Sequence, residues 1–342
     1  MNIYSINPIN DPRWTELLAR DERATIFHSS GWLSALRETY GYKAAVLTTS
    51  APSQPLANGV VFCAVRSRLT GRRLVSLPFS DHCEPLVRSS HELHEFVKYA
   101  AAGSWGYIEL RPQLLQSDAD ENPISFRKCG VYWLHRLNLS PDLETIFHRF
   151  HKDCVQRKIR RAKKENVVYQ EGNTPELLDT FYQLLLRTRR RHHLPPQPLD
   201  WFRNLVTCLG DCLKIRAASK GGKPIASIMT LTYKNTLMYK YGVSDERYHK
   251  FGGMQLLLWR AIQDAKNRGL DEFDMGRCDP KNAGLLAFKD RWGTTRSNLS
   301  YWRYQPKIFP LGQDLSIARR LFSFLPDRLQ QGAGRILYKH IG

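Results

Sequence analysis

A lysine near the end of this sequence is well suited to stabilising a developing negative charge. Lys289 lies in the segment Ala287-Phe-Lys-Asp-Arg-Trp-Gly293, which follows a predicted strand over residues 272–276. A cation beside an acyl carbonyl can stabilise the oxyanion that forms when a nucleophile attacks that carbonyl. We therefore expect Lys289 to be catalytic, in a loop that crosses the end of a sheet. The alternative is an ordinary surface lysine.

A carboxylate on the preceding strand could take part in proton transfer. Because residues alternate between the faces of a strand, Asp274 shares a face with Glu272. A carboxylate at a strand end can take a proton from an amine nucleophile, so Asp274 is the second catalytic candidate. That role requires one of the two carboxylates to be buried. Further substrate-binding candidates near the strand ends are Tyr241, Asp245, Arg277 and Trp292.

Two adjacent glycines precede a strongly helical pattern. Gly252 and Gly253 stand immediately before Met254–Lys266, whose apolar residues have helical spacing. Backbone N–H groups at a helix start bind phosphate, and glycines let a ligand approach closely. These glycines, with Lys250, therefore predict a phosphate-binding loop for a nucleotide donor. A simple helix-capping turn explains them equally well.

The densest basic run of the chain is Lys152–Lys164. Arg157, Arg160, Arg161 and Lys164 fall on one face of a predicted helix. Few acids relieve this run, so it carries repulsion between like charges four residues apart. We expect these four side chains to contact phosphate groups of a substrate, the alternative being a solvated helix surface.

The composition is that of a folded, strongly basic protein. The 342 residues are 42% hydrophobic and 11% aromatic, enough for substantial cores, and the formal net charge is +19. Such a charge favours anionic partners, which include nucleic acids, nucleotide cofactors, phosphorylated sugars and lipid head groups. Charge alone does not choose among them.

No metal site or tightly bound cofactor is predicted. The seven cysteines are scattered, and Cys208 and Cys212 have no second pair to complete a zinc site. The first residues show no secretory signal, and no apolar run approaches the roughly 18 residues needed to span a bilayer. These features predict reduced thiols and a cytoplasmic location.

The predicted elements fall into two similar halves. In the first half we expect helices over 12–18, 27–36 and 91–102, and strands over 44–49, 57–65, 74–79, 105–111 and 132–139. In the second half we expect helices from Ser140, over 177–191, 201–209 and 254–266, and an antiparallel meander over 213–219, 223–233 and 236–243. Ser29 or Ser30 is the expected N-cap of the helix near Trp32.

The proposed boundaries are a domain over 1–140, a second domain over 141–305 and a basic amphipathic tail over 306–342. The tail places Leu315, Ala318, Phe322 and Leu325 on one side. It is expected to pack on the N-terminal half, with contact to a membrane surface as the alternative.

Taken together, the chain resembles the Fem-type acyltransferases of the GNAT superfamily, most closely a bacterial subgroup encoded with exopolysaccharide and exosortase systems. The motifs that carry the resemblance are Phe27-His-Ser-Ser-Gly-Trp-Leu33, Ser76-Leu-Pro-Phe-Ser-Asp81, Arg157-Lys-Ile-Arg-Arg-Ala-Lys163, Tyr239-Lys-Tyr-Gly-Val-Ser-Asp245, Phe273-Asp-Met-Gly-Arg277 and Gly284-Leu-Leu-Ala-Phe-Lys-Asp-Arg-Trp-Gly293. The resemblance implies an α+β fold of two fused GNAT-like domains and transfer of an acyl or aminoacyl group to an amine.

In the peptidoglycan members of that family the donor is aminoacyl-tRNA and the acceptor a lipid- or nucleotide-linked muropeptide. The lysine of the Phe-Lys phrase there helps to stabilise the oxyanion, a role that would fall to Lys289. Two features depart from the pattern. No heptad segment forms a coiled-coil arm, and Gly252-Gly253 lacks the glycine spacing of coenzyme A loops. The exopolysaccharide-associated subgroup could use acyl-CoA and an amino sugar.

The leading hypothesis is an acyltransferase whose cleft between two lobes aligns a donor with an amine of an anionic cell-envelope precursor. One rival is an N-acetyltransferase of the same fold that uses acyl-CoA. The other is a non-enzymatic nucleic-acid-binding protein that uses residues 157–164 and 187–193. The protein could also contact the inner membrane peripherally.

Overall fold

The computed structural model describes residues 1–67, 71–114, 126–305, 334 and 337–340. Two compact units emerge. The described part of the N-terminal unit is 1–67, 71–114, 126–131, 299–305 and 337–340, and that of the C-terminal unit is 132–298 and 334. The chain passes from one unit to the other within two long strands, β6 (Arg127–Asn138) and β12 (Thr295–Tyr304). The first change falls at 131/132, within β6.

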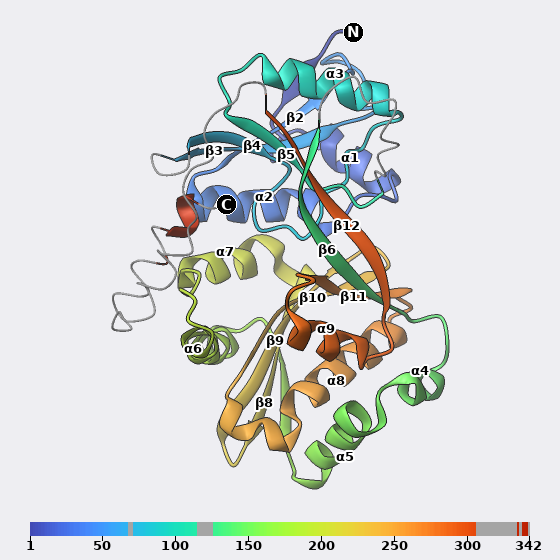
Figure 1. The fold of residues 1–342 in the computed structure, drawn as a ribbon, viewed down its shortest axis with the longest axis vertical. Coiled ribbons are helices and arrows are strands. Elements are labelled where there is room, and N and C mark those ends of the chain that lie inside the picture. The colour runs from blue at the N-terminus through green and yellow to red at the C-terminus, as the bar shows by residue number, and fades with distance from the viewer. Residues whose placement is uncertain (68–70, 115–125, 306–333, 335–336, 341–342) are drawn as a thin grey trace. The chain divides into compact units, whose positions relative to one another are not determined.

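The N-terminal unit contains a mixed sheet flanked by helices. Its strand order is β1-β2-β3-β4-β5-β12, in which only the β4–β5 pair is parallel. The further strands are β1 (Tyr4–Ile6), β2 (Lys43–Thr48), β3 (Val60–Ser67), β4 (Gly71–Val75) and β5 (Tyr107–Leu110). The main helices are α1 (Pro12–Arg20), α2 (Ser30–Tyr40) and α3 (Ser90–Ala101), and Figure 1 shows α2 and α3 on opposite sides of the sheet.

Local sequence signals set the helix ends in this unit. The Ser29 side chain accepts a hydrogen bond from the Trp32 N–H and caps α2, which ends at Gly41 in the left-handed conformation. Phe96 of α3 packs with Ile108 of β5 in the core. The N-cap predicted at Ser29 or Ser30 is confirmed, with Ser29 as the capping residue.

The described end of the C-terminal tail lies in the N-terminal unit. The Tyr42 hydroxyl donates to the carbonyls of Tyr338 (3.0 Å) and Lys339 (3.1 Å), and Arg73 donates to the carbonyl of His340 at 2.8 Å. Residues 337–340 therefore pack on this unit, the first of the two alternatives predicted for the tail. The amphipathic pattern from Leu315 to Leu325 lies outside the described residues.

The C-terminal unit is built on six mixed strands, ordered β6-β11-β10-β9-β8-β7. Its strands are β7 (Val168–Gly172), β8 (Leu213–Lys220), β9 (Lys223–Tyr233), β10 (Thr236–Ser244) and β11 (Glu272–Cys278). β10 and β11 are parallel, and the other pairs of this unit are antiparallel. The predicted meander over β8, β9 and β10 is confirmed.

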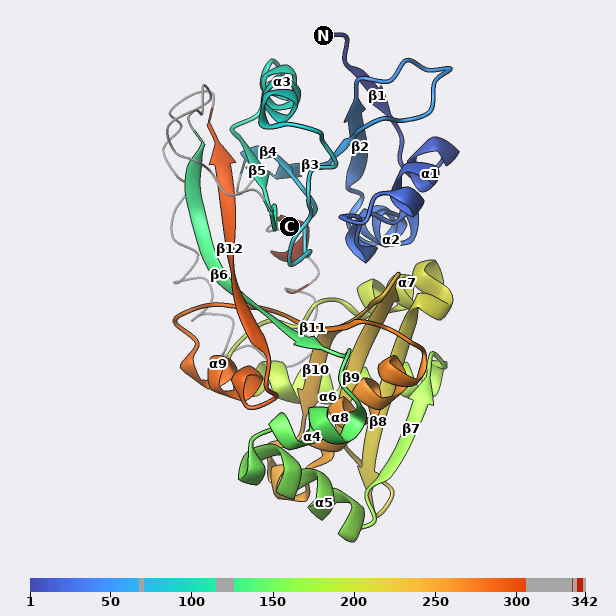
Figure 2. The same cartoon turned by 90° about the vertical axis from the view of Figure 1, so that its right-hand side faces the viewer.

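Helices cover both faces of that sheet. They are α4 (Leu143–Arg149), α5 (Arg157–Lys164), α6 (Pro175–Arg191), α7 (Leu199–Leu209), α8 (Gly253–Asn267) and α9 (Ala283–Asp290). In Figures 1 and 2, α8 lies on one face of β8–β10 and α6 on the other, and both pack on all three strands. Asp142, rather than the predicted Ser140, caps α4, because its carboxylate accepts from the Thr145 N–H.

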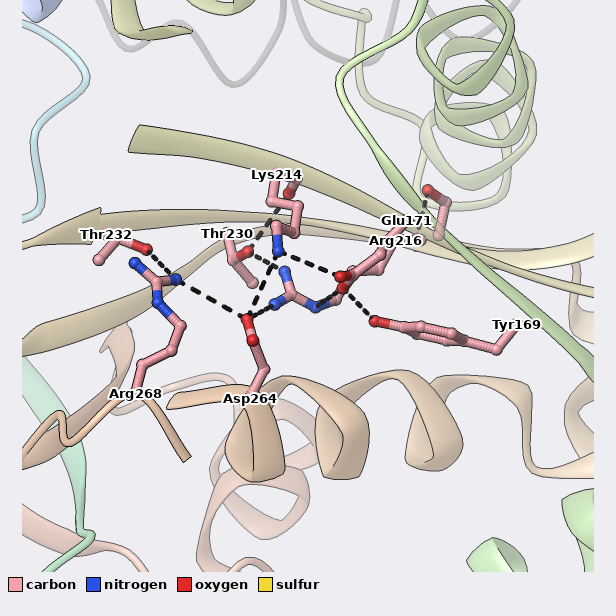
Figure 3. Close-up of polar contacts among 9 residues, drawn as sticks. Tyr169, Glu171, Lys214, Arg216, Thr230, Thr232, Asp264 and Arg268 are labelled. Atoms are coloured by element: carbon pink, nitrogen blue, oxygen red, sulfur yellow. Dashed lines mark hydrogen bonds and ion pairs between the residues drawn. The ribbon is translucent and has the colours of Figure 1, made fainter. Parts of the chain in front are cut away.

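A buried charge network ties α8 to its face of the sheet. The fully buried Arg216 of β8 donates to Thr230 Oγ1 at 2.7 Å and to Asp264 Oδ2 of α8 at 2.5 Å. Glu171 of β7 lies 3.4 Å from Arg216 and 3.1 Å from Lys214 (Figure 3). The Arg216–Asp264 pair joins a buried guanidinium to a partly exposed carboxylate and helps to fix how the helix sits on the strands.

Candidate active site

Lys289 lies on a helix, and the loop predicted for it is wrong. It occupies the last turn of α9, which the Asn282 side chain caps by accepting a hydrogen bond from the Leu285 N–H at 3.0 Å. The cap satisfies a free N–H at the helix start, so the chain coils despite Gly284. The helix ends at Asp290, next to a turn with Gly293 at φ +67°.

The ammonium group of Lys289 is buried against a β-bulge. The residue is 3% exposed, and its Nζ donates to the carbonyls of Gly276 and Arg277 at 2.8 Å each. The register of β11 against β6 shifts between Asp274 and Arg277, and Gly276 adopts φ +73°. Bulges disrupt the ladder of hydrogen bonds locally and re-aim side chains beside active sites. Here the bulge presents two backbone carbonyls to one lysine.

Asp274 is buried on the other side of the same bulge. It is 1% exposed, and its Oδ1 accepts from the Gly276 N–H at 2.6 Å. The burial that the sequence-based hypothesis required for a carboxylate on this strand is therefore present, whereas Glu272 is half-buried and pairs with Arg136 at 3.3 Å. The structure brings together the two residues predicted to be catalytic.

His135 of β6 belongs to this site and was not predicted from the sequence. It is fully buried, and its Nδ1 lies 3.2 Å from Thr294 Oγ1 and 3.7 Å from Asp290 Oδ1. Burial, followed by the charge of Lys289, lowers the pKa of His135 to about 4, so the imidazole is neutral near pH 7. The available signal was a histidine within the predicted strand over 132–139.

Tyr241 and Asp245 form a second group at the end of β10. Asp245 is 4% exposed and pairs with Arg247 at 2.6 Å and with Arg187 of α6 at 2.8 Å. Hydrogen bonds from Arg247 and then Arg187 hold the pKa of Asp245 well below its usual value. The Tyr241 hydroxyl accepts from Trp201 Nε1 at 2.9 Å, next to a register shift in β10.

The glycine pair has a packing reason that is independent of any ligand. Gly252 has φ +73°, and a Cβ there would clash with the Lys158 carbonyl of α5. A Cβ on Gly253 would lie 2.9 Å from the side chain of Ile225. Both glycines therefore allow α8 to begin close to α5 and β9. Lys250 is exposed, 5.1 Å over the ring of Phe251.

The basic face predicted on α5 is exposed as expected. Ile159 and Ala162 are buried, whereas the side chains of Arg157 and Arg161 are 71% and 50% exposed. Each of these arginines has one acidic neighbour four residues away in the chain, Asp153 at 2.9 Å or Glu165 at 3.6 Å. Arg160 and Lys164 are exposed on the same helix, and Arg160 lies over the Phe147 ring.

Two further candidates have structural roles. Arg277 stacks over the ring of Tyr132 at 4.3 Å. Trp292, expected to bind substrate, is fully buried and packs edge-on against Phe150 with ring centroids 5.0 Å apart. The expectation for Trp292 is corrected, since an indole enclosed in the core has no surface with which to meet a substrate.

No group of side chains suited to holding a metal ion occurs in the part of the chain that the structure describes. Among the same residues, no helix combines the length and apolar character needed to cross a membrane.

Residues 149–290 match the family model described as an acetyltransferase (GNAT) domain. A curated relative, the UDP-N-acetylmuramoylpentapeptide-lysine N(6)-alanyltransferase of Weissella viridescens, is 23% identical over 152 residues, covering 44% of this chain and 45% of that protein. The crystal structure of FemX is similar with a TM-score of 0.69 at 13% identity, covering 89% of this chain and 97% of that one. A tandem GNAT protein from the clavulanic acid biosynthesis pathway gives 0.54 at 11% identity, covering 90% and 99%.

These likenesses establish the fold. The sequence match spans 45% of the length of the curated relative. The structural matches span nearly the whole of both solved chains. The predicted mixed α/β fold of two fused GNAT-like domains is confirmed. The segment that matches the acetyltransferase (GNAT) domain model, residues 149–290, lies within the C-terminal unit.

Proposed function

We propose that this chain is a Fem-type transferase that moves an acyl or aminoacyl group from an activated donor to an amine of a cell-envelope precursor. The observation that carries the proposal is the Lys289 site. A buried ammonium group and a buried carboxylate meet at one bulge inside the segment that matches the GNAT domain. Ionisable groups buried together and away from the surface are frequent at catalytic sites.

In the proposed reaction the acceptor amine attacks the acyl carbonyl of the donor. The new N–C bond forms, the carbonyl oxygen becomes an oxyanion, and the bond to the donor oxygen or sulfur then breaks. Lys289 stabilises the oxyanion with its positive charge, a contribution that is large in a water-poor site. Asp274, or a phosphate of the substrate, receives the proton that the amine releases, and the leaving group is protonated as it departs.

The donor that we favour is aminoacyl-tRNA, and acyl-CoA is the alternative. The basic face of α5 offers exposed guanidinium groups for a phosphate backbone. Gly252 is already accounted for by the Lys158 carbonyl, which weakens the case for a coenzyme A loop built from Lys250, Gly252 and Gly253. No tightly bound cofactor is required in either case.

For the acceptor we propose an amine on an anionic nucleotide- or lipid-linked precursor. The name of the curated relative specifies a lysine of UDP-N-acetylmuramoylpentapeptide and an alanyl group. Within the same proposal, the exopolysaccharide-associated subgroup would direct the transfer to an amino sugar. A cytoplasmic enzyme that meets the inner membrane peripherally would have access to both kinds of acceptor.

Mass spectrometry of the product tests the proposal. The purified protein is incubated with alanyl-tRNA or acetyl-CoA, each with UDP-N-acetylmuramoylpentapeptide or an amino-sugar nucleotide. We expect an acceptor that gains one alanyl group in the tRNA reactions. Gain of an acetyl group alone would assign the enzyme to acyl-CoA. Unmodified acceptors together with tight RNA binding would favour the non-enzymatic rival.

A further inference from the structure

A chain of polar contacts runs from β6 to the last turn of α9. The His135 Nδ1 lies 3.2 Å from Thr294 Oγ1, and that hydroxyl donates to the backbone carbonyl of Lys289 at 3.1 Å. The Thr294 hydroxyl donates its one hydrogen to the carbonyl, so it must accept a hydrogen bond from His135. The imidazole proton is therefore on Nδ1. His135 is thus connected to the backbone of the lysine whose ammonium group lies in the bulge.

A second branch reaches the neighbouring residue of the helix. The same Nδ1 lies 3.7 Å from Asp290 Oδ1, and Asp290 in turn accepts from Arg296 Nε at 2.7 Å. Lys289 and Asp290 are the last two residues of α9. The end of the helix is therefore held through the backbone of Lys289, by the hydroxyl that the imidazole contacts, whereas the Asp290 carboxylate lies near the same nitrogen at more than hydrogen-bond distance.

Burial of the His135 ring is energetically unfavourable at one of its two nitrogen atoms. The side chain is fully buried, and within the described residues its Nε2 has no hydrogen-bond partner. Burying a polar atom without a hydrogen-bond partner is unfavourable. An apolar side chain of similar size would remove that cost, so a compensating role for the Nδ1 side of the ring is implied.

We propose that His135 is a positioning residue that, through Thr294, fixes the last turn of α9 and so the ammonium group of Lys289. The inference rests on the proposed function, because positioning matters only if Lys289 acts on a substrate. The Nδ1–H group is the part of the ring that does the positioning, and the charges near the ring are those of Lys289, Asp290, Arg296 and Asp274.

The geometry leads to a set of matched substitutions. An asparagine amide can place a donor near the position of Nδ1, whereas a glutamine amide reaches toward the position of Nε2. His135→Asn should therefore retain most of the turnover, and His135→Leu and His135→Gln should not. Thr294→Ser keeps the bridging hydroxyl and Thr294→Val removes it. His148→Leu is the control, because that side chain is 65% exposed on α4.

The test measures kcat and KM separately, alongside hydrogen exchange of residues 283–294. We expect His135→Leu and Thr294→Val to lower kcat about 100-fold with little change in KM, as displaced catalytic groups do. The double variant should lose no more than either single variant, since both changes break one chain of contacts. Exchange at the end of α9 should rise in the Leu variant and stay near wild type in the Asn variant.

Two results would overturn the positioning role. One is wild-type kcat and exchange in both His135→Leu and Thr294→Val. The other is a loss of turnover in His135→Asn that His135→Gln restores, which would assign the function to Nε2. If no donor supports turnover in the wild-type protein, the proposed function fails, whereas the exchange measurement still decides whether His135 orders the end of α9.

Discussion

Asp274 and Lys289 hold opposite sides of the same residue. The carboxylate of Asp274 accepts from the Gly276 N–H at 2.6 Å, and the ammonium group of Lys289 donates to the Gly276 carbonyl at 2.8 Å. The bulge in β11 thus joins the two catalytic candidates through backbone atoms. Substituting either residue also changes the bulge, so activity measurements on this site need parallel measurements of stability.

Gly252 and Gly269 provide a matched pair for testing the glycine loop. Both have φ +73°, but a Cβ on Gly269 meets nothing within 4 Å, whereas a Cβ on Gly252 would press on the Lys158 carbonyl. Gly269→Ala should cost about 1–2 kcal/mol of unfolding free energy for the left-handed backbone alone. Gly252→Ala should cost about 1–3 kcal/mol more, from overpacking. Equal losses in chemical denaturation would show that the close approach to Lys158 is unimportant.

The network around Arg216 should contribute strongly to stability. Asp264→Asn removes the carboxylate nearest to the fully buried guanidinium of Arg216 and leaves Glu171 at 3.4 Å, so the loss should lie between that of a surface pair and the roughly 3–5 kcal/mol of a fully buried one. The surface pair Asp200–Arg203 is the control, with side chains 46% and 60% exposed. Asp200→Asn should change stability by no more than about 1 kcal/mol. Similar small changes in the unfolding free energy of both variants would show that the Arg216–Asp264 pair does not stabilise the packing of α8 on the sheet.

Neutralising the basic face of α5 should weaken binding of an RNA donor. We expect the double variant Arg161→Ala/Lys164→Ala to bind tRNA less tightly and to reduce the slope of log affinity against log salt by about 1 for each phosphate that the variant no longer binds. The control is Arg203→Ala/Arg268→Ala, which removes two exposed cations elsewhere in the C-terminal unit. Identical tRNA affinities and salt slopes for the two double variants would show that the basic face of α5 is a solvated surface that does not bind RNA.

Acidification should destabilise the fold through two buried histidines. Burial, as the largest cause, lowers the pKa of His28 and of His135 from 6.5 to about 4. The unfolded chain then binds more protons than the folded one between those values. The unfolding free energy should therefore fall as the pH drops from about 6.5 to 4, by on the order of 3 kcal/mol for each histidine.

The measurement for this pH dependence is denaturant unfolding at several pH values. His135→Asn removes one of the two titrating groups, so the loss of stability on the acid side should shrink. The exposed His148, replaced by Asn, serves as the control and should leave the profile unchanged. An unchanged profile in His135→Asn would contradict the buried, neutral state of that histidine.

Much of the fold could be predicted from the sequence because its signals are local. The turns between β8, β9 and β10, the Ser29 cap and the glycines before α8 each specify their own few residues. α9 was missed because its cap comes from Asn282, whose signal was outweighed by Gly284 and Gly293.

The site was only partly predictable, since its geometry depends on partners far apart in the chain. The sequence indicated Asp274 and Lys289, but their meeting at Gly276 depends on the register shift between β6 and β11. His135 enters the site through the same pairing of strands. Trp292 was misjudged because an aromatic residue beside a candidate lysine looks the same in a sequence whether it lines a site or fills a core.

The most direct test of the proposed mechanism is the turnover of Lys289→Met with alanyl-tRNA and UDP-N-acetylmuramoylpentapeptide, or with whichever donor and acceptor support wild-type turnover. Methionine keeps the length of the side chain and removes the charge, so kcat should fall about 100- to 1,000-fold. Stability should also fall, by about 1–3 kcal/mol for each carbonyl left without a donor, because Gly276 and Arg277 lose their partner. Lys289→Arg should recover little activity, since a planar guanidinium does not replace a compact ammonium in a site that is 3% exposed. A folded Met variant with near-normal turnover would contradict the account and remove Lys289 from the mechanism.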